Sequence, residues 1–217
     1  MIEINQDILL NIAHISTSTR NLGPGERSVV WVQGCHKSCP GCIAAEWLSF
    51  EDNQIMPVTG LVDILLSSES IEGLTFSGGE PMEQAGGLAA LARLARTRKD
   101  LNIICFTGYT YELLINNPPN PGVLDLLQEI DVLIDGVYVR DMNDGVGLRG
   151  SSNQRIIHLT PRLKNENLEN LKRSVEIILD DDHIRMVGIP PRNMESVIDL
   201  VKRSTSAGVK EVGYERI

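Results

Sequence analysis

Residues 28–42 read Ser-Val-Val-Trp-Val-Gln-Gly-Cys-His-Lys-Ser-Cys-Pro-Gly-Cys, and this stretch decides both the fold and the chemistry. Its first six residues are mostly apolar and follow Gly23-Pro24-Gly25, which predicts a buried strand after a turn. Three cysteines, Cys35, Cys39 and Cys42, then share one short loop at the C-terminal end of that strand. Thiolates grouped so closely predict a metal centre.

The Cys-x3-Cys-x2-Cys spacing is compatible with three kinds of site. Three thiolates on a four-iron cluster leave one iron without a protein ligand, and a substrate can bind there. With Cys105 as a fourth ligand, the same cysteines would suit a structural zinc site. A disulfide is disfavoured, because residues 1–7 lack a signal-peptide pattern and four cysteines in 217 residues are few. The loop alone favours a cluster slightly over zinc, and a disulfide least.

Length and charge limit the class of protein. A chain of 217 residues can bury one substantial core, so we expect a single domain over residues 1–217. A net charge of −9, from 20 basic and 29 acidic side chains, argues against nucleic-acid binding. No apolar run approaches the roughly 18 residues of a membrane span. The absence of a signal sequence predicts a cytoplasmic protein.

Strands and helices are predicted to alternate after the cysteine loop. The predicted strands cover 73–77, 101–106, 131–135 and 154–159, and helices cover 57–67 and 82–95. Continuous apolar strands separated by helices are typical of an α/β fold with a parallel sheet. Ligands bind at the C-terminal ends of such strands. Those ends carry Cys35, Gly78-Gly79-Glu80, Thr107 and Asp135.

The pattern is weaker beyond Thr160. Residues 164–172 are polar and predict a loop or a frayed helix. Two apolar runs, 174–179 and 184–189, flank an aspartate-rich turn and predict a hairpin, and Asn193 is the expected N-cap of a last helix. We therefore expect a core over roughly residues 20–158 and a C-terminal α/β extension over roughly 160–217.

The cysteine motif, followed by Gly78-Gly79-Glu80-Pro81, resembles the radical S-adenosylmethionine superfamily. Within it, the chain is similar to the glycyl-radical-enzyme activases, in the branch that serves anaerobic ribonucleotide reductases. The segments that carry this likeness are Gly23–Arg27, Cys39–Cys42, Asp131–Gly136 and Leu148–Arg155. The resemblance implies a partial parallel (β/α) barrel, a [4Fe-4S] cluster and S-adenosyl-L-methionine as cofactors. It also implies reductive cleavage of S-adenosylmethionine to a 5′-deoxyadenosyl radical.

The resemblance assigns roles to individual residues. It makes the three loop cysteines the catalytic cluster ligands, and it implies that S-adenosylmethionine is bound by Gly78, Gly79, Glu80, Thr107, Asp135 and Asn153. Some activases also hold a monovalent cation near the position of Asp135. Structural alternatives stay open: the glycines can form a strand-to-helix turn, and Glu80 can complement a helix dipole. Cys105 lies within a strand and is better interpreted as a small buried hydrophobe than as a ligand.

The expected function is to install a glycyl radical on a partner enzyme, such as an anaerobic ribonucleotide reductase. The resemblance implies flavodoxin or ferredoxin as the electron donor. A short barrel with an open side would suit the docking of a protein loop. One alternative is radical chemistry on a small molecule or peptide, with the extension lining its pocket. A second alternative is a non-catalytic zinc or iron–sulfur protein.

Overall fold

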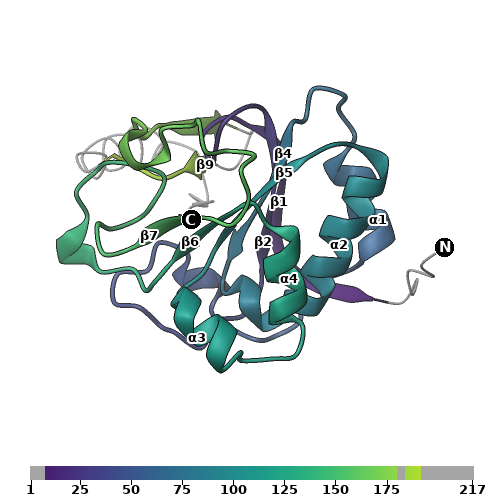
Figure 1. Ribbon diagram of the computed structural model, residues 1–217, viewed down its shortest axis with the longest axis horizontal. Helices are drawn as coiled ribbons and strands as arrows, with labels where there is room; N and C mark the ends of the chain where they lie inside the picture. Colours follow the sequence, from purple (N-terminus) through teal and green to yellow (C-terminus); the bar gives the residue numbers. More distant parts are fainter. Residues whose placement is uncertain (1–7, 180–183, 192–217) are drawn as a thin grey trace, which may run out of the picture.

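The computed structural model describes residues 8–179 and 184–191 and is built on one seven-stranded sheet (Figure 1). The strand order is β3-β1-β2-β4-β5-β6-β7, with parallel pairing from β2 through β4 and β5 to β6 and antiparallel pairing elsewhere. The strands are β1 (Leu9–Thr19), β2 (Arg27–Val32), β3 (Gln54–Pro57), β4 (Gly73–Gly78), β5 (Asn102–Phe106), β6 (Val132–Asp135) and β7 (Arg155–His158).

The main helices cover one face of the sheet. Figure 1 shows α1, α2 and α4 together on that side. The helices are α1 (Val58–Leu65), α2 (Ala85–Arg98), α3 (Tyr111–Asn116) and α4 (Val123–Glu129), with short 3-10 turns η1 (Ala45–Trp47), η2 (Pro81–Gln84), η3 (Arg140–Met142) and η4 (Leu168–Asn170). No helix in the described ranges is long and apolar enough to cross a membrane.

Alternating side chains on each strand divide the apolar interior into two clusters. Val30 and Val32 face the helices, together with buried residues of α1 and α2. Val29 and Trp31 point to the opposite face of the sheet, as expected from the two-residue period of a strand. There they pack in a second cluster with Leu148, Leu163, Leu168, Val187 and Ile189. Residues beyond Thr160 therefore cover part of the face that the helices leave open.

The predicted α/β class and its parallel core are confirmed. The structure adds two strands that the sequence did not predict, β1 and β3, which extend the sheet beyond β2 with antiparallel pairing. The predicted strand over 154–159 exists as β7, but it runs antiparallel to β6. The edge strands β3 and β7 stand at opposite ends of the strand order, so the sheet is open. The partial barrel implied by the resemblance stays a prediction.

The C-terminal extension contains the predicted hairpin. Its strands are β8 (Val175–Leu179) and β9 (Ile184–Gly188), which pair antiparallel. The polar segment over 164–172 is mostly loop and contains only the turn η4. The helix expected to begin at Asn193 lies outside the described residues.

Arg27 ties the strands together at the edge opposite the strand ends that carry the cysteine loop. Its side chain is fully buried and donates hydrogen bonds to Thr75 Oγ1 at 2.8 Å, Pro24 O at 3.0 Å and Leu74 O at 2.6 Å. It also donates to the side chain of Asn102. Burial lowers the pKa of Arg27 to about 9, and the negative charges of Asp131 and Glu72 oppose this shift.

Replacing this arginine tests how strongly it holds the strands. We expect Arg27→Met to lower the free energy of unfolding by about 3 kcal/mol or more, because several buried acceptors would lose their donors. Urea denaturation of the purified protein measures the change. Arg98→Ala is the matched control, since Arg98 pairs with Asp63 at the surface and should contribute at most about 1 kcal/mol. Equal losses in the two variants would contradict a central role for Arg27.

Candidate active site

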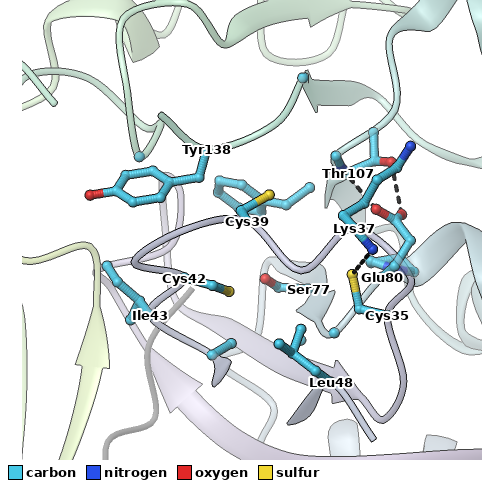
Figure 2. A pocket seen from close by; sticks show the side chains of 18 of the residues that line it. Cys35, Lys37, Cys39, Cys42, Ile43, Leu48, Ser77, Glu80, Thr107 and Tyr138 are labelled. Carbon is cyan, nitrogen blue, oxygen red and sulfur yellow. Dashed lines mark hydrogen bonds between the residues drawn. The ribbon is translucent and has the colours of Figure 1, made fainter. Parts of the chain in front are cut away.

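Loops that follow four parallel strands line one cavity of about 100 Å³ (Figure 2). The loop after β2 contributes the three motif cysteines, and the segments after β4, β5 and β6 contribute the opposing walls. A second part of the wall comes from the turn before β7. The polar and glycine residues of this wall are Lys37, Ser77, Gly78, Gly79, Glu80, Thr107, Gly108, Gly136, Tyr138, Gly150 and Gln154.

The cysteine loop presents three free thiols to this cavity. Cys35, Cys39 and Cys42 are unpaired, and their side chains point into the same space in Figure 2. The loop bends through Gly34, Ser38 and Gly41, each with positive φ. A side chain at Gly34 would meet the ring of Phe50 at 2.7 Å, and Gly41 is packed against Arg140. These glycines let the loop fold back tightly enough to face the cavity.

The donor set fits a cluster better than a single ion. No group of three or more His, Cys, Asp or Glu side chains within the described residues is arranged around one metal ion. A four-iron cluster distributes its thiolate ligands over different irons, so its ligands need to surround a space and not a point. Burial raises the pKa of the Cys35 and Cys42 thiols. A bound metal would supply the positive charge that favours their thiolates.

Cys105 takes no part in this site. It is fully buried on β5, within the apolar cluster that faces the helices. Its Sγ lies 3.5 Å from the carbonyl oxygen of Phe106, and burial raises the pKa of the thiol well above its ordinary value. The structure therefore does not bring Cys105 to the loop cysteines, in agreement with its interpretation as a buried hydrophobe.

Gly78 and Gly79 form the part of the cavity wall that follows β4. Gly78 has a φ of +114°, and a Cβ there would collide with the backbone of Val32. A Cβ on Gly79 would collide with the carbonyl oxygen of Gly34. The N–H of Gly79 donates to Val32 O at 2.7 Å, and the N–H of Glu80 donates to Gly34 O at 2.9 Å. Only glycine permits this contact between the two loops.

Glu80 is a buried residue of the cavity wall, with three donors directed at its carboxylate. Oε1 accepts from the Met82 N–H at 3.0 Å and from the Thr107 hydroxyl at 2.8 Å, and Oε2 accepts from the Gly108 N–H at 2.7 Å. Burial outweighs these hydrogen bonds and raises the pKa of Glu80 to about 7. Thr107 thus lies beside Glu80. The pair joins the end of β4 to the end of β5.

Asp135 is buried but is not part of the cavity wall. Its Oδ1 accepts from Arg155 Nε at 2.9 Å, and its Oδ2 accepts from the Tyr111 N–H at 2.7 Å and from the same guanidinium. Arg155 reaches Glu112 as well, at 2.7 Å. The cation beside Asp135 in this structure is therefore an arginine side chain. The next residue, Gly136, lines the cavity.

Asn153 also lies outside the cavity wall, whereas its neighbour Gln154 lies within it. Asn153 Nδ2 donates to Val137 O at 2.8 Å, and its buried Oδ1 has no partner in the described part of the chain. Gln154 Nε2 donates to Gly136 O at 2.8 Å, while its Oε1 accepts from the Gly150 N–H at 2.7 Å. The role of Asn153 in binding S-adenosylmethionine stays a prediction, and the structure adds Gln154 as the residue of this segment that lines the cavity.

Lys37 and Tyr138 are wall residues that the motifs did not predict. The ammonium of Lys37 lies 3.5 Å from the centre of the Tyr109 ring, a cation–π contact. Tyr138 and Lys37, with Cys39, also line a second hollow of about 530 Å³ between the cysteine loop and residues 137–141. Only the fold identifies Lys37 and Tyr138 as wall residues, because neither belongs to a motif with a characteristic spacing or residue type. His36, by contrast, is largely exposed and lies 3.1 Å from a carboxylate oxygen of Glu83.

The buried carboxyl of Glu80 predicts a pH dependence of stability. Between the ordinary glutamate pKa of 4.5 and the raised pKa of about 7, the folded protein keeps a proton that the unfolded chain has lost. The stability of the metal-free protein should therefore fall, by roughly 3 kcal/mol, as the pH rises through this range. Urea denaturation at several pH values under reducing conditions measures the slope. The Glu80→Gln variant should lose this pH dependence. An unchanged slope in that variant would show that Glu80 is not its source.

Comparison with known proteins places this geometry in a family. Residues 21–157 match the family described as "4Fe-4S single cluster domain". That range contains the cysteine loop, both glycines of the β4 wall and Gln154.

Curated relatives agree with this match. The anaerobic ribonucleoside-triphosphate reductase-activating protein of enterobacteria phage T4 is 30% identical over 141 residues, which cover 62% of this chain and 85% of that protein. The protein of the same name from Vibrio cholerae is 34% identical over 144 residues, with 63% and 89% covered. The one from Escherichia coli K12 is 32% identical over 147 residues, with 63% and 91% covered. The chain thus belongs to the 4Fe-4S single cluster domain family and, within it, to the family of anaerobic ribonucleoside-triphosphate reductase-activating proteins.

Proposed function

We propose that the chain is a radical S-adenosylmethionine enzyme that installs a glycyl radical on an anaerobic ribonucleotide reductase. The observation that carries this proposal is the presence, around one cavity, of three free thiols from one loop and the backbone of Gly78 and Gly79. The names of its relatives support the partner, since they describe proteins that activate anaerobic ribonucleoside-triphosphate reductases. The proposal includes flavodoxin or ferredoxin as the electron donor.

The three cysteines would hold a [4Fe-4S] cluster and leave one iron for S-adenosylmethionine. When bound, these two cofactors supply reductive cleavage of the sulfonium, which yields methionine and the 5′-deoxyadenosyl radical that takes a hydrogen atom from the target glycine. The loop itself contributes ligand placement, because its bends at Gly34 and Gly41 direct the thiols inward.

The opposing wall would contact S-adenosylmethionine mainly through backbone atoms and not through long side chains. Gly78 and Gly79 present only backbone to the cavity, and the space that a Cβ would need at each is filled by Val32 and Gly34. Glu80 and Thr107 hold the wall in place through their mutual hydrogen bond, and the ionised form of Glu80 would provide negative charge for the methionyl ammonium. Apolar wall residues restrict water around the reacting atoms; they are Ile43, Ala44, Leu48 and Phe106.

The structure leads us to revise two roles within this proposal. Asp135 would act by holding Arg155 and the N-terminus of α3, and Asn153 by bracing the backbone at Val137. Gly136 and Gln154, which line the cavity, would be the nearer contacts for S-adenosylmethionine. The hollow between the cysteine loop and residues 137–141 would admit the glycine-bearing segment of the partner, because it adjoins the cavity at Cys39 and Tyr138.

The function is tested by following the radical onto the partner. The cluster-loaded protein is incubated without oxygen with dithionite, S-adenosylmethionine and an anaerobic ribonucleotide reductase. We expect 5′-deoxyadenosine and an electron paramagnetic resonance doublet from a glycyl radical on the reductase. Formation of 5′-deoxyadenosine without that doublet would contradict the proposed partner and favour a small-molecule or peptide substrate. Zinc in place of iron in the purified protein would contradict the radical chemistry.

Two cysteine variants test the ligand assignment. Cys39→Ala should lose the brown cluster and 5′-deoxyadenosine formation, because one cluster ligand is removed while the loop lies at the surface. Cys105→Ala is the matched control and should keep the iron content, since Cys105 is buried on the helix side of the sheet. Iron and sulfide analysis after reconstitution measures both. Loss of iron in the Cys105 variant would restore a four-cysteine site.

A further inference from the structure

Arg173 lies beyond residue 157, where the family match ends, yet its side chain is buried inside the loop over residues 143–150. Its guanidinium donates to Asn143 Oδ1 at 2.7 Å, to Gly147 O at 3.2 Å and to Val146 O at 3.2 Å. It also donates to the carbonyl oxygens of Arg149 and Gly150. One side chain of the C-terminal extension thus holds the backbone of this loop at four carbonyl groups.

Backbone contacts from the extension support the same loop. The N–H of Gly147 donates to Leu171 O at 3.0 Å, and the N–H of Leu148 donates to Leu168 O at 2.8 Å. Leu148 and Leu168 are both buried in the apolar cluster on the open face of the sheet. The extension and the loop are therefore joined by hydrogen bonds and by a shared core, with Arg173 at the centre of the contact.

The same loop ends in the wall of the active-site cavity. Gly150 lines the cavity, and its N–H donates to Gln154 Oε1 at 2.7 Å. Gln154 in turn reaches Gly136 O at 2.8 Å. A Cβ on Gly150 would lie 3.0 Å from the ring of Tyr138, so the backbone at Gly150 also supports that ring. A shift of Gly150 would therefore move Tyr138 and Gln154, two other parts of the wall.

The hydrogen-bonding geometry calls for an arginine. Five N–H groups in a planar fork can serve several carbonyl groups at once, whereas the three donors of a lysine ammonium radiate from one point. The nearest carboxylate is that of Asp144, at 3.5 Å, which also pairs with Arg149 at 3.0 Å. The carbonyl groups thus accept most of the hydrogen bonds that the buried guanidinium of Arg173 donates.

We propose that Arg173 is a positioning residue of the active site: it fixes the loop over 143–150 and, through Gly150, the wall formed by Tyr138, Gln154 and Gly136. This role rests on the proposed function, since that wall is the one assigned to S-adenosylmethionine. The site of this chain therefore depends on a residue outside the segment that matches the family.

Hydrogen exchange and cofactor binding test this role on the reconstituted, cluster-loaded protein. Arg173→Ala should keep its iron content but exchange the amides of residues 143–150 faster than wild type. It should also bind S-adenosylmethionine about 10- to 100-fold more weakly, because the wall that receives it is displaced. Arg173→Lys keeps the charge and most of the stem, so it should fold even if the alanine variant does not, and it should show the same two changes to a smaller extent.

Two additions separate positioning from general destabilisation. Arg162→Ala removes another arginine of the extension, whose partners Asp100 and Asp131 precede β5 and β6 at the opposite edge of the sheet. It should leave both the exchange of residues 143–150 and the affinity unchanged. Millimolar methylguanidinium, but not potassium chloride at equal ionic strength, should restore affinity in Arg173→Ala by refilling the carbonyl-lined space.

Three results would contradict the proposal, and each would overturn a different part of it. Faster exchange over 143–150 with wild-type affinity would overturn the positioning role and leave Arg173 as a structural residue only. Unchanged amide exchange of residues 143–150 in both Arg173 variants would show that Arg173 does not hold this loop. Failure of the wild-type, cluster-loaded protein to bind S-adenosylmethionine would instead overturn the proposed function, and this role with it, whatever the exchange of the loop shows.

Discussion

The backbone contact between the loop after β2 and the loop after β4 is the constraint on which the site depends. No side chain fits at Gly78 or Gly79, because Val32 and Gly34 occupy the space a Cβ would need. Two hydrogen bonds between the loops hold the contact. It brings the cysteine loop and the glycine wall to one cavity, so both halves of the site depend on residues that offer no side-chain chemistry.

Two buried polar groups brace the cavity, Glu80 within its wall and Asp135 behind it. Glu80 joins the ends of β4 and β5, and Asp135 with Arg155 joins β6, β7 and α3. These groups have their hydrogen-bonding capacity occupied by the protein, which fixes the backbone that faces the cavity. The residues that line the cavity include three thiols and several glycines, beside apolar and polar side chains such as Leu48 and Gln154. A wall held rigid in this way would suit the proposed radical chemistry, in which the protein positions its cofactors and excludes competing reactions.

The sequence predicts the parallel core and the cysteine loop well, because both have strong local signals. The buried strands β2, β4, β5 and β6 are apolar runs, and the close spacing of the three cysteines indicates a metal centre. The sequence does not predict β1 because its second half, Ser16–Thr19, is polar, and it does not predict β3 because that strand (Gln-Ile-Met-Pro) is mostly exposed and has only two apolar residues before a proline. The direction of β7 depends on pairing with β6, which a local pattern does not encode.

Site residues were predictable only where residue type restricts the role. The cysteines and the two glycines qualify, whereas Asn153 and Gln154 are similar amides at adjacent positions that point to different places. Choosing between them requires the path of the backbone. The pairing of Asp135 with Arg155 is likewise invisible before the fold is known, because the two residues are separated by the loop over 143–150.

Arg173 holds the loop over residues 143–150 mainly through hydrogen bonds to backbone carbonyl oxygens, which every amino acid possesses. These contacts with carbonyl oxygens do not depend on the side chains of residues 146–150, although Leu148 is fixed by its place in the core, Gly147 by its positive φ and Gly150 by crowding. An exposed position such as Val146 can therefore change its side chain, and with it the surface beside the site, without loosening the backbone of the loop. Stability of the wall and variability of the neighbouring surface are separately adjustable in this chain.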